Sequence, residues 1–225
     1  NMANLYIVAT PIGNLKDITL RALEVLKSAD LVLAEDTRVT RKLLDHYDIK
    51  VPLESFHEHT DKKKIDRILA LLAEGQTLVL VTDAGTPGVS DPGNFLVARV
   101  RALLPDVTIV PIPGPSAITA LVSVAGIPMD EFTYLGFLPH KKGRKTALGK
   151  IATSEIPVIV LESTHRIKKL LEELVRECPH KRVVIGRELT KKFEEVLQGL
   201  PAEILELLKK KPEKTKGEFV VIVAE

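Results

Sequence analysis

The chain alternates short apolar runs with longer amphipathic stretches, and this alternation limits the folds open to it more than any other feature. In the first half, runs typical of buried strands lie at residues 5–9, 31–34, 77–81 and 108–110. Apolar residues at helical spacing over residues 19–27 and 64–73 predict helices between them. This strand–helix–strand order predicts a parallel sheet.

A cluster of prolines and glycine at residues 111–115 precedes a smooth helical pattern at 116–124, which is typical of a domain boundary. We predict domains at residues 1–112 and 113–225. In the second domain, strand-like runs lie at 132–136, 158–161, 182–186, 195–198 and 218–223. Helical patterns lie at 166–177 and 202–209. Consecutive short strands between 182 and 198 indicate antiparallel pairing. The expected fold class is therefore α/β, with a mostly parallel N-terminal sheet and a mixed C-terminal sheet.

The composition excludes several classes of protein. Hydrophobic residues make up 45% of the 225 residues, which is enough for a globular core and argues against a disordered chain. No run reaches the roughly 18 consecutive apolar residues of a membrane helix. The single cysteine, Cys178, excludes an internal disulfide framework and favours a reducing compartment, so we expect a cytoplasmic protein.

Motifs for metals and for common nucleotide cofactors are missing. No set of Cys and His residues has the spacing of zinc ligands, and His57 with His59 alone is weak evidence, so we expect no metal. The chain lacks GxxxxGK[ST], the phosphate loop of many nucleotide hydrolases, and GxGxxG after its first strand, the fingerprint of dinucleotide oxidoreductases. With a net charge of +2, binding of a nucleic acid would require local basic patches.

Four loops that follow predicted strands carry the candidate chemistry, because ligands of open parallel sheets bind beyond the carboxyl ends of the strands. The third loop, residues 82–93, holds three glycines, two prolines and two aspartates. Glycines let a ligand approach the backbone, prolines stiffen the loop, and Asp or Ser side chains accept hydrogen bonds from an amine or a ribose. The other loops are TPIGN at 10–14, EDTR at 35–38 and PGPSA at 113–117.

The same loops also have plainer explanations. TPIGN alone is equally an ordinary strand-to-helix turn. In EDTR, Asp36 or Thr37 could cap the next helix, and Arg38 could pair with a neighbouring acid. Ser116 of PGPSA is a natural helix cap. We favour a functional role for EDTR because two carboxylates and a guanidinium meet there at a strand end.

With these loops the chain closely resembles the tetrapyrrole methylase superfamily over residues 4–224. The motifs VATPIGNLKDITLRA, EDTR, SFHEHT, TDAGTPGVSDPG, PGPSA and GFLPHKKGRK are similar to those of the branch that methylates ribosomal RNA. Enzymes that act on tetrapyrroles have GxGPG in the first loop and GDP in the third. Here Pro11 sits one position earlier and Thr86-Pro87 replaces Asp-Pro, which favours the RNA branch.

The resemblance implies that S-adenosylmethionine binds in a cleft between the two domains. It further implies methyl transfer to the ribose 2′-hydroxyl of a cytidine in the decoding region of 16S ribosomal RNA, within the small ribosomal subunit and by a homodimer. Carried over by position, the expected cofactor contacts, several through backbone atoms, are Pro11, Ala84, Gly85, Thr86, Val89, Ser116, Ala117, Glu162, Leu189 and Glu218. Many members of the RNA branch continue into a further small C-terminal region, so we expect a short member or one that lacks it.

Methyl transfer to a hydroxyl requires in-line approach, and a nearby carboxylate can take the proton as the new bond forms. The candidates for this catalytic role are Asp36, Glu35 and Asp91. Arg38 is a candidate for substrate binding, since its planar guanidinium can hold a phosphate or orient a carboxylate.

Basic residues gather without an acid at 140–150, and we predict RNA contacts from Lys141, Lys142, Arg144 and Lys145. A solvated basic loop is the alternative. The lysines at 209–216 follow a helix and could simply favour its negative end. An aromatic content of 4% argues against a broad base-stacking platform.

Two further functions stay open. A C-methyltransferase acting on a tetrapyrrole shares the cofactor chemistry, and it would leave the methyl group in a macrocyclic product. A cofactor-binding regulatory or ribosome-assembly module would bind cofactor and ribosome without transferring a methyl group.

Overall fold

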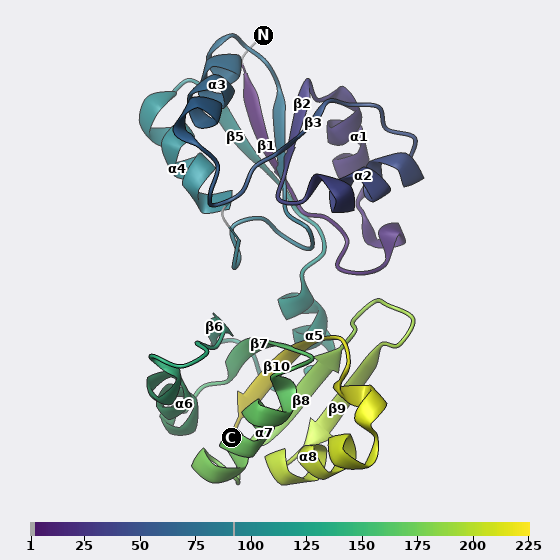
Figure 1. The fold of residues 1–225 in the computed structure, drawn as a ribbon, viewed down its shortest axis with the longest axis vertical. Helices are drawn as coiled ribbons and strands as arrows, with labels where there is room; N and C mark the ends of the chain where they lie inside the picture. The colour runs from purple at the N-terminus through teal and green to yellow at the C-terminus, as the bar shows by residue number, and fades with distance from the viewer. Residues whose placement is uncertain (1–2, 92) are drawn as a thin grey trace. The chain divides into compact units, whose positions relative to one another are not determined.

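The computed structural model describes residues 3–91 and 93–225, and the chain divides into two compact units, 1–116 and 117–225 (Figure 1). The sequence placed this division at 112/113. The difference arises because the segment after Ile112 packs against the first unit. A Cβ added at Gly114 would lie 3.0 Å from the Cβ of Ala9, and the Thr86 hydroxyl donates to the Pro115 carbonyl at 3.3 Å.

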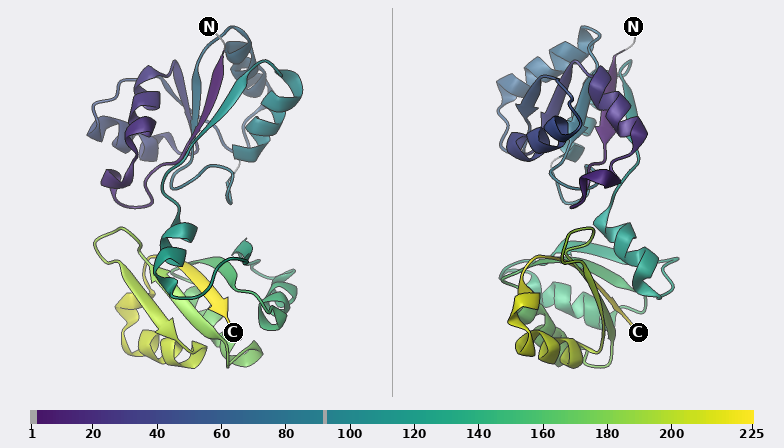
Figure 2. Two further views of the ribbon diagram at one scale, coloured as in Figure 1. Left: turned by 180° about the vertical axis from the view of Figure 1, so that it is seen from behind. Right: turned by 90° about the vertical axis from the view of Figure 1, so that its right-hand side faces the viewer.

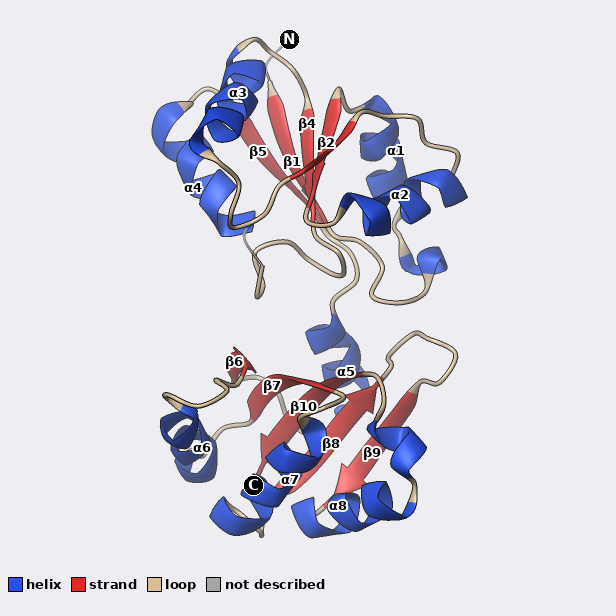
Figure 3. Ribbon diagram, in the orientation of Figure 1, coloured by secondary structure: helices blue, strands red, loops and turns tan. Residues whose placement is uncertain are grey.

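Unit 1 is built on a five-stranded parallel sheet in the order β3-β2-β4-β1-β5, as Figure 3 shows in red. The predicted parallel sheet is therefore confirmed. The strands are β1 (Asn4–Val8), β2 (Leu31–Ala34), β3 (Leu53–Ser55), β4 (Leu78–Val81) and β5 (Thr108–Ile112). The helices are η1 (Leu15–Asp17), α1 (Leu20–Ser28), α2 (Thr37–His46), α3 (Lys62–Ala73) and α4 (Gly93–Leu103).

Helices cover both faces of this sheet, because the central strands are apolar at every position. Along β2, Val32 and Ala34 pack with buried residues of α1 and α2. The alternate residues Leu31 and Leu33 pack with α3 and α4 on the opposite face. Strands buried on both faces read as continuous apolar runs, which is why the sequence located β2 and β4 so closely.

Polar caps set where the helices of unit 1 begin. The Thr19 hydroxyl accepts from the backbone N–H of Ala22 at 3.2 Å, and an Asp61 oxygen accepts from that of Lys64 at 2.8 Å. Each bond satisfies one of the free amides of a first turn. Sequence analysis missed β3, a half-buried edge strand of three residues that is too short to show an alternation.

Unit 2 contains the mixed sheet that the sequence predicted. Its order is β6-β7-β10-β8-β9, with β6 and β7 parallel and the other neighbours antiparallel. The strands are β6 (Thr133–Phe137), β7 (Val158–Ser163), β8 (Arg182–Arg187), β9 (Glu195–Gly199) and β10 (Glu218–Ala224). The helical segments are α5 (Ala117–Ala125), α6 (Arg144–Thr153), α7 (Ile167–Glu177), α8 (Pro201–Lys210) and η2 (Pro212–Thr215).

The main core of unit 2 lies between the sheet and α6, α7 and α8. Helix α5 packs against β8 and β10. The right-hand view of Figure 2 shows α5 in teal on one side of this sheet and α8 in yellow-green on the other. Across the described part of the chain, no helix is long and apolar enough to cross a membrane.

Replacing Leu33 with alanine tests the double-sided burial of the unit 1 sheet. Leu33 is fully buried, so Leu33→Ala should lower the free energy of unfolding by about 2–5 kcal/mol through lost burial and the cavity left behind. Leu20→Ala is the matched control, because Leu20 is 79% exposed on α1 and should change stability little. Urea denaturation of both variants checks this, and equal stabilities would contradict the packing.

Candidate functional site

Two of the four candidate loops are joined by backbone hydrogen bonds at the carboxyl edge of the unit 1 sheet. The N–H of Thr10 donates to the Gly85 carbonyl at 2.9 Å, and the N–H of Gly85 donates back to the Thr10 carbonyl at 3.0 Å. The Thr10 hydroxyl also donates to the Thr82 carbonyl at 3.1 Å. The loop after β1 and the loop after β4 therefore hold each other in place.

The PGPSA segment meets the same loops at Gly85. This glycine has φ +79°, and a Cβ there would lie 3.5 Å from Ile12 Cγ2 and 3.6 Å from the Pro115 carbonyl oxygen. The positive φ favours glycine, because side chains make this conformation costly. Of the expected cofactor contacts, Ala84, Thr86 and Val89 are exposed, whereas Pro11 and Gly85 are buried.

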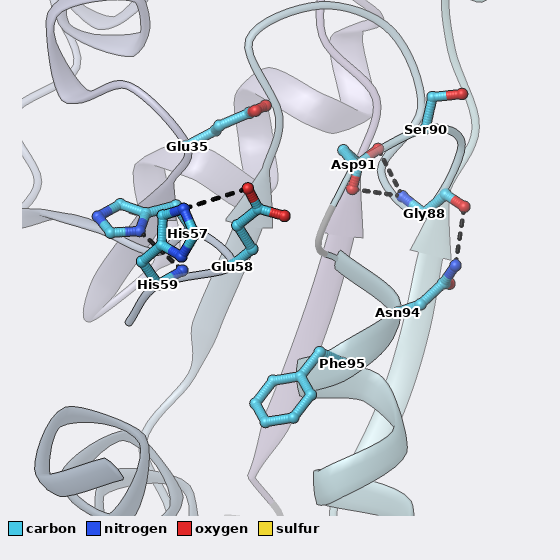
Figure 4. Close-up of a pocket in the computed structure, with 9 residues that line it drawn as sticks. All are labelled: Glu35, His57, Glu58, His59, Gly88, Ser90, Asp91, Asn94 and Phe95. Carbon is cyan, nitrogen blue, oxygen red and sulfur yellow. Dashed lines mark hydrogen bonds and ion pairs between the residues drawn. The ribbon is translucent and has the colours of Figure 1, made fainter. Parts of the chain in front are cut away.

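Asp91 shapes the loop after β4. Its carboxylate accepts from the backbone N–H groups of Gly88 at 2.8 Å, Val89 at 3.1 Å and Gly93 at 2.8 Å. Figure 4 shows the carboxylate turned toward Gly88. A carboxylate that accepts three amide hydrogen bonds is committed to holding the loop, so the geometry favours this role for Asp91 over proton transfer.

The EDTR segment begins α2, and Asp36 both caps this helix and pairs with Arg38. Asp36 accepts from the backbone N–H of Arg38 at 2.8 Å, and its carboxylate receives the guanidinium at 2.6 Å. The Arg38 side chain lowers the pKa of Asp36 to about 2. Such a carboxylate is a weaker base than an ordinary one, so it is the less suitable proton acceptor at neutral pH.

Asp83 is a residue that sequence reasoning passed over. Its carboxylate accepts from the backbone N–H of Asp36 at 2.9 Å, which links the loops after β2 and β4. Burial raises the pKa of Asp83, and the negative charges of Glu35 and Asp36 act in the same direction. The available signal was positional, since Asp83 and Glu35 both follow neighbouring strands of one parallel sheet.

Glu35 faces a pocket of about 770 Å³ in unit 1. The Thr82 hydroxyl donates to its Oε2 at 2.9 Å, which orients the carboxylate. Figure 4 shows the pocket residues, which are Glu35, His57, Glu58, His59, Gly88, Ser90, Asp91, Asn94 and Phe95. Within residues 3–91 and 93–225, no three His, Cys, Asp or Glu side chains are grouped as metal ligands.

In unit 2 the expected cofactor residues have three different environments. Glu162 is buried near the end of β7, where Arg166 Nε lies 3.4 Å from its Oε1, and among the described residues its Oε2 has no hydrogen-bond partner. Leu189 is buried, whereas Glu218 is exposed. Ala117, the first residue of α5, is half-buried, as is Ser116, the last residue of unit 1.

The structure corrects the role predicted for Arg144. This residue begins α6 and is buried, and its guanidinium forms three hydrogen bonds with the Glu173 carboxylate, the shortest at 2.6 Å. The paired carboxylate raises the pKa of Arg144 further. Its charge is satisfied inside unit 2 and does not reach a surface ligand. Lys141, Lys142 and Lys145 are exposed, which is compatible both with the predicted RNA contact and with a solvated basic loop.

Two arginines hold the backbone that leads into this basic segment. Arg144 Nη1 donates to the Pro139 carbonyl at 3.1 Å, and Arg166 Nη2 donates to the Leu138 carbonyl. Glu162 and Glu173 supply the opposite charges. Buried cations are tolerated when they are paired in this way.

Comparison with known proteins places the chain in a family. The family model of Tetrapyrrole (Corrin/Porphyrin) Methylases matches residues 4–205. The chain belongs to this family. The expected membership is thus confirmed, and this tetrapyrrole methylase family member is a methyltransferase whose cofactor is S-adenosylmethionine.

Curated relatives of this family member carry one name. Proteins named Ribosomal RNA small subunit methyltransferase I from Escherichia coli O157:H7 and Vibrio cholerae are 47% and 45% identical to it. The alignments cover 99% and 97% of this chain, and 78% and 76% of the relatives. These names agree with the RNA branch that the loop motifs indicated.

Solved structures of tetrapyrrole methylases share the fold. A cobalt precorrin-4 methyltransferase matches with a TM-score of 0.72 at 19% identity, over 98% of this chain and 94% of its own. A uroporphyrin-III C-methyltransferase from Thermus thermophilus, complexed with S-adenyl homocysteine, matches with a TM-score of 0.63 at 21% identity, over 99% and 97%. At these identities the likeness establishes the fold alone.

The loop after β4 fits an adenosyl cofactor in its chemistry. Gly85 and Gly88 adopt φ +79° and +92°, so the backbone turns without side chains at these positions. The small or apolar side chains of Ala84 and Val89 are exposed beside them. Apolar surface with a few backbone polar groups is what a site for a nucleoside and a sulfonium requires.

Substitution of Asp83 separates its hydrogen bond from its charge. Asp83→Ala removes the acceptor for the Asp36 N–H and should lower the free energy of unfolding by about 1–3 kcal/mol. Asp83→Asn keeps an acceptor oxygen, so its free energy of unfolding should fall by less than that of Asp83→Ala. The pKa of Asp83 is raised in the fold from its ordinary value of 3.8, so ionisation of Asp83 destabilises the folded protein as pH rises. An asparagine side chain cannot ionise, so the difference in unfolding free energy between Asp83→Asn and the wild type should shift in favour of the variant between about pH 4 and pH 7. Urea denaturation at both pH values measures this, and equal losses at pH 7 would exclude the acceptor role.

Replacing Glu173 with glutamine tests the buried pair in unit 2. Glu173→Gln leaves Arg144 charged beside a neutral partner, and we expect a loss of about 3 kcal/mol in the free energy of unfolding. Glu172→Gln, at the exposed neighbouring position on α7, should change it by less than about 0.5 kcal/mol. Thermal and urea unfolding compare the two, and similar stabilities would mean that the pair does not support the fold.

Proposed function

We propose that this chain transfers a methyl group from S-adenosylmethionine to the ribose 2′-hydroxyl of a cytidine in the decoding region of 16S ribosomal RNA. The observation that carries the proposal is the 43–47% identity to proteins named Ribosomal RNA small subunit methyltransferase I, along nearly the whole chain. The meeting of four motif-bearing loops at one sheet edge supports it.

In the proposed reaction the ribose oxygen attacks the methyl carbon, the carbon–sulfur bond breaks, and S-adenosylhomocysteine leaves. The protein must hold the hydroxyl in line and accept its proton. Among the three carboxylate candidates, Glu35 suits the proton best. Arg38 lowers the pKa of Asp36 to about 2, and the Asp91 carboxylate is engaged by three backbone amides of its own loop. Among the hydrogen bonds of the described residues, Glu35 accepts only that of the Thr82 hydroxyl, and it borders the pocket.

RNA contact is proposed for the exposed lysines of the basic segment, Lys141, Lys142 and Lys145. Arg144 contributes to this contact from inside the fold, because it and Arg166 fix the Leu138 and Pro139 carbonyls just before the lysines. Arg38 is 87% exposed at its side chain and keeps its proposed role as a phosphate contact. We further propose that the active form is a cytoplasmic homodimer acting on the assembled small ribosomal subunit.

The test is transfer of labelled methyl from S-adenosylmethionine to small ribosomal subunits that lack the modification, followed by nuclease mapping. Label on the ribose of one cytidine is the expected outcome. Label on a base, or none despite measured cofactor binding, would contradict the proposal. Label on a tetrapyrrole substrate instead would favour the C-methyltransferase alternative.

The same assay tests the role of Glu35. Glu35→Gln should lower kcat by about 100-fold or more, the usual contribution of a general base, with unchanged affinity for S-adenosylhomocysteine. Glu24→Gln is the matched control, since Glu24 is an exposed carboxylate on α1. A Glu35→Gln protein with wild-type kcat would remove Glu35 from proton transfer.

A further inference from the structure

The pocket beside Glu35 is larger than proton transfer requires. It lies where three parallel strands end: Glu35 follows β2, the segment 57–59 follows β3, and the segment 88–91 follows β4. The first turn of α4 closes it with Asn94 and Phe95. A volume of about 770 Å³ falls within the range of small-molecule sites and exceeds what a single nucleobase needs.

The lining of this pocket is rich in hydrogen-bond acceptors. Glu35, Glu58 and Asp91 contribute carboxylates, and among the described residues that line the pocket there is no lysine or arginine. Such a surface repels phosphate and favours a neutral group that carries N–H donors. Glu58 is an exposed carboxylate whose Oε1 lies 3.3 Å from Nε2 of His59, and both residues line the pocket.

Aromatic rings contribute to two sides of the pocket. Phe95, 45% exposed, comes from α4, and His57 and His59 come from the segment after β3 (Figure 4). The guanidinium of Arg99 lies 5.3 Å from the centroid of the Phe95 ring, so a cation stands beside the pocket without lining it. An exposed aromatic ring is a surface on which an unstacked base can stack.

We propose that this pocket binds the base of the target nucleotide and selects cytosine over uracil. Phe95 stacks on the base, and Glu58 accepts a hydrogen bond from the exocyclic amino group. Uracil presents a carbonyl oxygen at that position, which a carboxylate repels. The inference rests on the proposed function, since base and ribose belong to one nucleotide and Glu35 borders the same pocket.

The selection is tested with small ribosomal subunits reconstituted to carry either cytidine or uridine at the target position. The wild type should methylate the cytidine subunits at least tenfold faster in kcat/KM. Glu58→Gln should lower the ratio of kcat/KM for cytidine to kcat/KM for uridine about tenfold, because a glutamine amide can donate to the uracil oxygen. Phe95→Ala should lower kcat/KM for cytidine about tenfold, the loss expected for one stacked base. Phe95→Leu should lower kcat/KM for cytidine by less than Phe95→Ala does.

A matched control is available in unit 2. Phe193 is 63% exposed, with the Lys192 ammonium 5.5 Å from its ring centroid, so it resembles Phe95 in exposure and in its cationic neighbour. Phe193→Ala should leave both kinetic constants unchanged. Affinity for S-adenosylhomocysteine, measured by calorimetry, should be the same in all variants.

The outcomes separate this inference from the proposed function. Equal methylation of cytidine and uridine by the wild type would overturn base selection and leave the proposed function standing. Weaker binding of S-adenosylhomocysteine by Phe95→Ala or Glu58→Gln, in proportion to the lost activity, would assign the pocket to the cofactor and overturn the inference. Absence of transfer to either subunit, with cofactor bound, would overturn both.

Discussion

The paired hydrogen bonds between Thr10 and Gly85 are the contact on which the loops of unit 1 depend. They form because β1 and β4 are neighbours in a parallel sheet, so that their following loops leave from the same edge. Glycine at position 85 lets the loop after β4 turn back toward Thr10 with a positive φ. The remaining contacts, from Thr86 to Pro115 and from Asp83 to Asp36, extend this bridge to the other two loops.

Three neighbouring carboxylates acquire different properties from small differences in their partners. Asp36 faces a guanidinium and is held ionised, whereas Asp83 is partly buried beside other negative charges and retains its proton more readily. Glu35 receives a hydroxyl and borders a pocket. Different partners can therefore keep one carboxylate of a site as a structural anion while another remains available for proton transfer.

The elements that the sequence predicted well are those whose pattern is local. Strands such as β2 and β4 are apolar at each position, and helices such as α1 begin at a capping hydroxyl. The edge strand β3 was missed because three half-buried residues carry no periodicity. Three of the candidate loops stood out because glycine and proline mark special backbone, and EDTR stood out because charged residues directly follow an apolar strand.

What the sequence concealed depends on partners distant along the chain. Arg144 lies in a run of surface cations, and only the position of Glu173 on α7, 29 residues away, shows that it is buried and paired. Asp83 is likewise defined by its contact with Asp36, 47 residues away. A residue's neighbours in sequence indicate its local structure, but its burial and charge partners are set by the tertiary fold.

The buried Arg144 beneath the basic segment responds to salt differently from the exposed lysines. Mobile ions screen exposed charges over about a nanometre at ordinary ionic strength, but they do not enter a packed interior. Rising salt therefore weakens the attraction of the exposed Lys141 and Lys142 for anions, whereas the hydrogen bond from Arg144 to the Pro139 carbonyl is retained. On the proposed function, rising salt would release RNA from these lysines while the segment keeps its conformation.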